Sequence, residues 1–355
     1  MSPESSRARQ RAAEMSADSH AVVGPLQGYH HETYVFPLPA PVTGAPMRVK
    51  CREPRENLLW FDRRCFASEE RLLRALQGRV VRIPELIEVE GLGFQRFIEG
   101  HTVGSRHGSG RALPPSMAEQ VVDLFRQLAG ITPQTLPVER QCRPEDRPEG
   151  GDTEGFLERL IWFAEERVYR DNLPEFQALF DSLGVNDVSF KHLRKHVSGL
   201  TERPFCLLHA DLHRENFIVD AEGGLWTIDW ELAMFGDPLY DLATHLYLMR
   251  YPKRQEQEMT LRWCEAVEHV RPGSARGWCE DLPRLLDFKR AQSVFTDVIR
   301  TSQSLSGEGR VRPRNLRQVT SKLEAVLRAG AVPLGLDSLP GRQEIEAALR
   351  RHAGC

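Results

Sequence analysis

The stretch LLHADLHRENFIVDAEGGLWTIDWE (207–231) constrains the fold of this chain more than any other part of the sequence. It contains two apolar segments around the turn-forming residues DAEGG, which is the pattern of a short β-hairpin. Asp211 and Asn216 precede the first segment, and Asp229 follows the second. Because the strands of a hairpin run antiparallel, we expect Asn216 and Asp229 to lie at the same end, with Asp211 nearby.

These three side chains predict phosphoryl-transfer chemistry. An amide oxygen and a carboxylate suit Mg²⁺, which takes a few protein oxygens and leaves its other positions to phosphate and water. Asn216 and Asp229 are therefore the predicted metal ligands. Asp211 is then available as the catalytic base that accepts a proton from a hydroxyl group. Each residue alone is more often a turn or cap residue, and it is their order in one short stretch that favours a functional interpretation.

Charge and composition argue against several other classes of function. The 355 residues have a formal net charge of −3 and contain no isolated basic block, so nothing points to nucleic-acid binding. No apolar run is long enough to span a bilayer and the N-terminus has no apolar signal core, so we expect no membrane association. The seven cysteines include no CxxC pair, which argues against a disulfide framework and a structural zinc site. Together these features predict a cytoplasmic protein.

The chain divides into two unequal parts after a short tail. Residues 1–20 are polar and lack apolar periodicity, which predicts a disordered tail. Residues 21–100 predict a small lobe with the order strand, strand, helix, strand, strand, in the segments 33–38, 47–52, 66–78, 86–91 and 93–100. Residues 101–355 carry mainly amphipathic helical patterns. The predicted fold class is therefore α+β.

Three segments resemble the aminoglycoside phosphotransferase family, in the small-molecule kinase branch of the protein-kinase-like superfamily. They are HADLHREN (209–216), IDWE (228–231) and GDPLYDLATHL (236–246), in the order and spacing of that family. The resemblance implies a bilobal protein-kinase-like fold, with an antiparallel sheet plus one helix in a small N-lobe and a larger, mainly helical C-lobe. It also implies a catalytic base (Asp211), two metal ligands (Asn216 and Asp229) and three loop-supporting residues (His209, Glu231 and Asp241).

The first lobe is expected to bind the nucleotide through a cation on a strand. Lys50 lies within the predicted strand 47–52, where a lysine that faces inwards requires a partner. Glu69, at the start of the following helix, is the predicted partner of Lys50, and Glu70 is the alternative. By resemblance to the family, this pair contacts the α- and β-phosphates of ATP.

Two further segments of the first lobe are assigned to the nucleotide mainly by the same resemblance. Gly28 belongs to the loop over the phosphates, which lacks a GxGxxG motif, so side chains at His30, His31 and Thr33 are additional candidate donors. The backbone from Phe97 to Glu99 belongs to the linker between the lobes and is expected to meet the adenine edge.

These features predict an ATP- and Mg²⁺-dependent O-phosphotransferase that acts on a hydroxyl of a small molecule, such as an antibiotic, a sugar or an amino alcohol. The alternatives are a kinase for Ser or Thr of a peptide or protein, and a nucleotide-binding module without transfer activity. Only seven residues separate Asp229 from Asp237, which is too few for a peptide-cradling activation segment. Asp211 argues against a module that only binds. The acceptor, the choice of ATP or GTP and any protein partner stay open.

The acceptor pocket is expected on the segments 153–172 and 240–251. In the first of these, acidic and basic residues nearly cancel, which favours a solvated face over an acidic basin for a polycationic acceptor.

Overall fold

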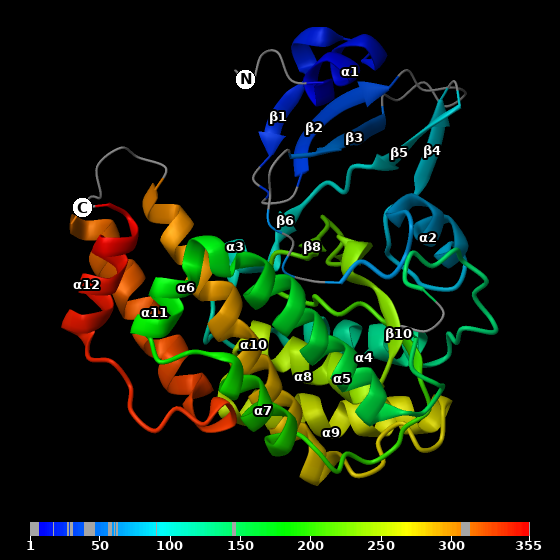
Figure 1. Ribbon diagram of the computed structural model, residues 1–355. Helices are drawn as coiled ribbons and strands as arrows, with labels where there is room; N and C mark the ends of the chain where they lie inside the picture. The colour runs from blue at the N-terminus through cyan, green and yellow to red at the C-terminus, as the bar shows by residue number, and fades with distance from the viewer. Residues whose placement is uncertain are drawn as a thin grey trace.

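A five-stranded antiparallel sheet forms the N-lobe of the computed structural model (Figure 1). The structure describes residues 7–16, 18–26, 28, 31–38, 47–55, 59, 61, 63–89, 91–143, 147–306 and 313–354. In spatial order the strands are β1 (Val23–Leu26), β2 (His31–Leu38), β3 (Met47–Pro54), β5 (Leu92–Arg96) and β4 (Leu86–Val89). Of these, β1 was not predicted from the sequence.

Strand alternation separates the two faces of this sheet. Val49 and Cys51 of β3 are buried in the small core of the N-lobe. Lys50 and Arg52 therefore point to the opposite face, because successive side chains of a strand alternate. That face also receives α2 (Glu69–Leu76), which begins at the N-cap Ser68 and buries Leu72, Leu73 and Leu76.

Helix α1 (Arg7–Met15) packs against β2 and β3, where the sequence predicted a disordered tail. Ala8 and Ala12 lie one turn apart and are 1% and 0% exposed. Arg11 adds an ion pair with Glu53 at 3.1 Å. The prediction was wrong for this helix because it relied on large apolar residues, whereas α1 approaches the sheet closely through a stripe of alanines.

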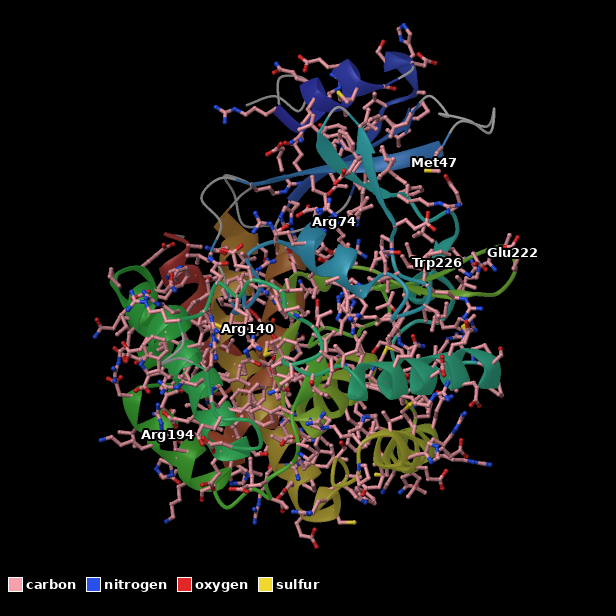
Figure 2. All side chains as sticks on the ribbon, turned by 90° about the vertical axis from the view of Figure 1, so that its right-hand side faces the viewer. Met47, Arg74, Arg140, Arg194, Glu222 and Trp226 are labelled. Atoms are coloured by element: carbon pink, nitrogen blue, oxygen red, sulfur yellow. The ribbon has the colours of Figure 1, made fainter. Side chains whose placement is uncertain are left out.

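The C-lobe is built mainly of helices (Figure 1). They are α3 (Val103–Arg106), α4 (Pro115–Ala129), α5 (Thr153–Phe163), α6 (Leu173–Ser182), α7 (Asp187–His196), α8 (Pro238–Met249), α9 (Lys253–Val270), α10 (Trp278–Ser306), α11 (Pro313–Leu334) and α12 (Arg342–His352). Figure 2 shows the side of the molecule, with Met47 of β3 in the N-lobe above Trp226 of the C-lobe. The predicted α+β class and bilobal kinase-like fold are confirmed.

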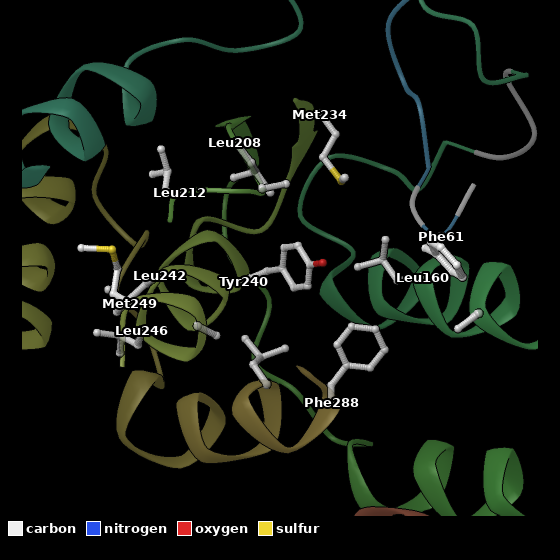
Figure 3. Packing of buried hydrophobic residues seen from close by; sticks show 14 of the residues in the cluster. Phe61, Leu160, Leu208, Leu212, Met234, Tyr240, Leu242, Leu246, Met249 and Phe288 are labelled. Carbon is white, nitrogen blue, oxygen red and sulfur yellow. The ribbon is translucent and has the colours of Figure 1, made fainter. Parts of the chain in front are cut away.

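Helix α8 lies at the centre of the C-lobe core. Tyr240, Leu242, Leu246 and Met249 of this helix pack with Phe288 of α10 and with other residues shown in Figure 3. No helix in the described ranges combines the length and the apolarity that a membrane crossing requires.

Two small sheets of the C-lobe position the predicted functional loop. Strand β7 (Cys206–Leu208) pairs with β10 (Met234–Gly236), and β8 (Phe217–Val219) pairs with both β6 (His101–Thr102) and β9 (Leu225–Thr227). In the β8–β9 hairpin, Phe217 lies opposite Thr227. The Asp220 carboxylate closes the turn by accepting the N–H groups of Glu222 and Gly224. The loop 209–216 therefore connects two anchored strands.

Candidate active site

One buried carboxylate holds the backbone at the start of the loop 209–216. Asp241 of α8 accepts the backbone N–H groups of His209 at 3.0 Å and Ala210 at 2.8 Å. These bonds fix Ala210 at φ 64°, a left-handed conformation that a residue other than glycine rarely adopts. Burial raises the pKa of Asp241 to about 6, and the two amide bonds oppose that shift. A His209 ring nitrogen lies 3.1 Å from the carbonyl oxygen of Ile228, which ties the loop to the hairpin.

Asp211 and Asn216 are in direct contact. The Asn216 amide nitrogen donates to the Asp211 carbonyl oxygen at 2.9 Å and to its carboxylate at 3.1 Å. His213, whose ring lies 3.4 Å from the same carboxylate, contributes a further polar neighbour. Asn216 also accepts the backbone N–H of Ile228 at 3.0 Å, so it lies one residue from Asp229 across the hairpin. The structure thus brings the predicted base and the predicted metal ligands to one end of the hairpin.

Asp229 has a left-handed backbone conformation directly after the hairpin. Its φ of 65° is again unusual for a residue that is not glycine. The Asp229 side chain is 35% exposed. Partial burial raises the pKa of Asp229 to about 6; Arg52 opposes this shift, and Glu69 and Glu231 add to it.

The donors at this position fit a hard divalent cation. Asn216 uses its amide nitrogen for Asp211, which leaves its amide oxygen as a possible metal ligand at the end of the hairpin where Asp229 follows. Among the described residues, no group of three or more His, Cys, Asp or Glu side chains could hold a metal ion. A pair of oxygen donors matches the way Mg²⁺ is held when phosphate supplies further ligands.

Among the described residues, Glu69 forms its ion pair with Arg52 and not with the predicted partner Lys50. The Arg52 guanidinium lies 2.5 Å from the Glu69 carboxylate. It also lies 3.4 Å from Asp229 and 3.3 Å from Glu231. The predicted Lys50–Glu69 pair is therefore replaced by an Arg52–Glu69 pair. Lys50 and Arg52 share one face of β3, and the longer, forked guanidinium reaches several carboxylates at once.

Glu69 and Glu231 connect the two lobes through this arginine. Glu69 also accepts the Gln95 side chain at 2.8 Å and the backbone N–H of Trp230, in the C-lobe, at 2.8 Å. Glu231 forms ion pairs with Arg64 and Arg52. Glu231 was predicted to support the loop, whereas its ion pairs join it to residues of the first lobe.

His31 completes this cluster, with its ring 3.0 Å from Arg52 and 3.4 Å from Glu231. Burial and the positive charge of Arg52 lower the pKa of His31 to about 4, despite the nearby Glu231 carboxylate. A neutral imidazole is therefore expected at neutral pH.

Lys50 lies beside this cluster, since the charges of Arg52, Glu69, Asp229 and Glu231 all act on it. Burial and the neighbouring Arg52 lower the pKa of Lys50. Gly28 is exposed. Phe97 donates its backbone N–H to the Arg48 carbonyl oxygen at 2.9 Å, and Glu99 pairs with the Arg48 guanidinium at 3.1 Å. The alternative partner of Lys50, Glu70, is exposed and accepts from Ser68. His30 lies outside the described residues.

A small cavity adjoins the loop at Ala210. Its lining residues come from α5, α8, α10, β10, the loop itself, the turn after Asp229 and the segment before α2; they are Arg63, Leu160, Phe163, Ala210, Leu232, Met234, Tyr240 and Gln292. Glu165, which could have contributed to an acidic basin, is buried and paired with Arg170 at 2.8 Å and Arg194 at 2.7 Å. None of the described residues that line this cavity carries a carboxylate.

Arg52 and Arg64 were not predicted from the sequence. The signal for Arg52 was present, because a residue two positions after Lys50 on a strand shares its face. The signal for Arg64 was absent, because its segment has no regular secondary structure to fix its direction.

The chain is similar to known phosphotransferases. The sequence pattern of the family described as "Phosphotransferase enzyme family" matches residues 46–288. No curated protein matches the chain.

Solved structures share the fold at low identity. A choline/ethanolamine kinase family protein from Mesorhizobium loti is 17% identical, with a TM-score of 0.53 over 96% of this chain and 98% of that one. A macrolide 2'-phosphotransferase from Brachybacterium faecium is 14% identical, with a TM-score of 0.51 over 93% and 98%. An ethanolamine kinase from Plasmodium vivax is 14% identical, with a TM-score of 0.51 over 87% and 82%.

Proposed function

Because the chain belongs to the phosphotransferase enzyme family, we propose that it transfers the γ-phosphoryl group of ATP to a hydroxyl group of a small molecule. One observation carries this proposal: Asp211 and Asn216 touch at 3.1 Å, at the end of the hairpin where Asp229 follows. Phosphoryl transfer requires a carboxylate near the attacking hydroxyl and oxygen ligands for a metal near the leaving group. The loop supplies both within a few residues.

The roles divide among the side chains of this loop. Asp211 orients the acceptor hydroxyl and takes its proton. The Asn216 amide holds the Asp211 carboxylate in place and offers its own oxygen, with Asp229, to Mg²⁺. The metal ion would neutralise charge on the phosphate oxygens. His209 and Asp241 keep the loop in the conformation that aims Asp211. Since this chemistry consists mostly of positioning and charge stabilisation, these residues are expected to affect turnover more than stability.

The first lobe binds the nucleotide in this proposal. Arg52, held by Glu69, and Lys50 on the same face of β3 are the candidate cations for the phosphates. The backbone from Phe97 to Glu99 meets the adenine edge, and the loop that contains Gly28 covers the phosphates. Arg52 takes precedence over Lys50 because it already contacts Glu69 and Asp229.

Replacing Arg52 by methionine is expected to lower turnover by roughly 10²- to 10³-fold, the usual loss when one charge-stabilising donor leaves an active site. The substitution keeps an unbranched side chain and removes the charge that Glu69, Asp229 and Glu231 share. Nucleotide affinity and turnover are measured for Arg52→Met and Lys50→Met side by side.

The matched lysine variant decides between the two cations. A smaller loss in Lys50→Met supports the assignment of Arg52. A normal Arg52→Met enzyme with an inactive Lys50→Met enzyme would return the phosphate contact to Lys50. The free energy of unfolding of both variants separates loss of a phosphate contact from loss of folding.

A small acceptor fits better than a peptide. The segment from Asp229 to Asp237 is short, and residues of α5, α8 and α10 line the space beside Ala210. By their names, the similar solved structures include kinases of choline or ethanolamine and of a macrolide. Phosphorylation of Ser or Thr in a peptide is the second candidate and is tested in the same acceptor screen.

Thermal unfolding with and without Mg²⁺–ATP is the first test of this function. A ligand at 100 times its dissociation constant stabilises the folded state by about 2.7 kcal/mol. We expect wild type to show this stabilisation only with Mg²⁺ present, and Asp229→Ala to lose the part that depends on the metal.

Two results would count against the proposal. If neither ATP nor GTP raises the unfolding temperature of wild type, nucleotide binding fails and with it the transfer reaction. If Asp229→Ala keeps the full Mg²⁺ dependence, Asp229 is not a metal ligand. A metal-dependent shift in wild type leads to the acceptor screen, in which phosphate transfer from labelled ATP is measured.

A further inference from the structure

Two cysteines with no part in the proposed reaction face each other between α2 and the C-lobe. Cys65 lies in the segment that precedes α2, and Cys142 lies in the loop that follows α4. The Cys142 sulfur is 4.0 Å from the carbonyl oxygen of Cys65, and each thiol shifts the pKa of the other. Both cysteines are reduced in this structure.

The backbone around these thiols already holds them together. Phe66 and Arg140 form an isolated antiparallel bridge, and the N–H of Gln141 donates to the Cys65 carbonyl oxygen at 2.9 Å. In Figure 2, Arg140 lies below α2 on the side of the C-lobe. The bridge places Cys65 opposite Gln141, so Cys142 is the next residue along the facing segment. This backbone pairing holds the two cysteines near each other before any bond between their sulfurs forms.

The pair is chemically asymmetric. Cys142 is partly exposed, whereas Cys65 is 7% exposed. The hydrogen bond from Cys65 lowers the pKa of Cys142, and nearby Arg147 and Arg63 add to this effect against the opposing effect of burial. The Arg147 guanidinium donates to the Cys142 carbonyl oxygen at 2.7 Å. Because the thiolate is the reactive form of cysteine, Cys142 is the accessible nucleophile and Cys65 is the partner that resolves it.

We propose that Cys65 and Cys142 form a reversible disulfide in response to hydrogen peroxide, and that this bond slows turnover. The Cys142 thiolate attacks one peroxide oxygen; an S–O bond forms, the O–O bond breaks, and hydroxide leaves as water after protonation. The Cys65 sulfur then attacks the sulfenic acid; the S–S bond forms, the S–O bond breaks, and a second water leaves. Two thiols are oxidised and one peroxide is reduced.

The disulfide would act through the segment that links Cys65 to Glu69. Arg64, beside Cys65, pairs with Glu231, and Glu69 accepts the N–H of Trp230 at 2.8 Å. A covalent bond at Cys65 would hold the start of α2 against the C-lobe. Bilobal enzymes open and close during turnover, so a fixed α2 is expected to slow nucleotide exchange. This effect on turnover rests on the proposed function, whereas formation of the bond does not.

The test treats reduced wild-type protein with hydrogen peroxide and digests it with trypsin without reduction. Trypsin does not cut before proline, so the expected product joins residues 65–71 to residues 141–159. Hydrogen exchange in α2 should become slower in the oxidised protein, and dithiothreitol should reverse both changes. In a working transfer assay, oxidised wild type should lose turnover and recover it on reduction.

Matched variants identify the residues involved. Cys142→Ser should form no linked peptide and keep its turnover in peroxide. Cys65→Ser should accumulate a sulfenic acid at Cys142 that dimedone traps. Cys279→Ser, which removes an exposed cysteine on α10, should behave as wild type.

Several outcomes would overturn the inference. If wild type yields no linked peptide, or if Cys142 oxidises further without bonding to Cys65, the disulfide does not exist. If the bond forms but turnover stays unchanged in a working assay, its regulatory effect is excluded. If no acceptor is ever phosphorylated, the proposed function fails, and the linked peptide and the exchange rate of α2 still decide whether the disulfide forms.

Discussion

Replacing Asp211 by asparagine is expected to lower turnover by about 10²- to 10⁴-fold, the usual contribution of a positioned general base. Asparagine has nearly the shape of aspartate and keeps a carbonyl oxygen that can accept the Asn216 amide bond. It has no carboxylate to take the hydroxyl proton. Folding and Mg²⁺–ATP binding should therefore stay near wild type while transfer is almost lost. Single-turnover transfer and nucleotide affinity measure the two parts separately.

The control for this variant is Glu222→Gln. Glu222 is an exposed acid on the β8–β9 turn, so its neutralisation changes charge by the same amount without touching the loop. We expect this enzyme to turn over normally. An Asp211→Asn enzyme that is as active as Glu222→Gln would show that Asp211 is not the base.

Replacing Arg203 by methionine is expected to lower the free energy of unfolding by about 3–5 kcal/mol, the usual cost of breaking a buried ion pair. The Arg203 guanidinium binds Asp237 at 2.8 Å and Asp281 at 2.8 Å, and all three side chains are at most 1% exposed. Asp237 also caps α8 by accepting the N–H of Leu239 at 2.8 Å. Without Arg203, two buried carboxylates lose their cation. Urea unfolding measures the difference.

Arg254→Met is the matched control for this loss. Arg254 pairs with Glu258 at 2.8 Å, but its side chain is 92% exposed. Exposed ion pairs contribute little to stability because water screens them. A similarly small loss in Arg203→Met would mean that the buried network does not stabilise the C-lobe.

The arrangement of the loop 209–216 could be predicted because its signals are local. The DAEGG turn, the apolar segments around it and the order of Asp211, Asn216 and Asp229 all lie within one stretch of chain. A hairpin brings its two ends together whatever the rest of the fold does. Asn216 accordingly meets the backbone of Ile228, one residue from Asp229. The segment that begins at Gly236 is similar, because Asp237 caps the helix that begins at the next residue.

The partner of Glu69 could not be predicted in the same way. Lys50 and Arg52 are both cations on one face of β3, and the sequence contains no measure of how far each side chain reaches. Only the position of α2 and of the Asp229 backbone shows that the guanidinium meets three carboxylates. Helix α1 was missed for a related reason, because two alanines become a packing stripe only when a sheet lies against them.

Local patterns of the chain were therefore sufficient to predict the α+β class, the two lobes, the hairpin and the arrangement of the loop 209–216. These depend on periodicity, turn chemistry and spacing along the chain, which are local properties. The tertiary structure decided the Arg52 cluster, the cavity beside Ala210 and the meeting of Cys65 with Cys142. Their members are far apart in sequence, and side-chain reach and packing between lobes bring them together, which no local pattern encodes.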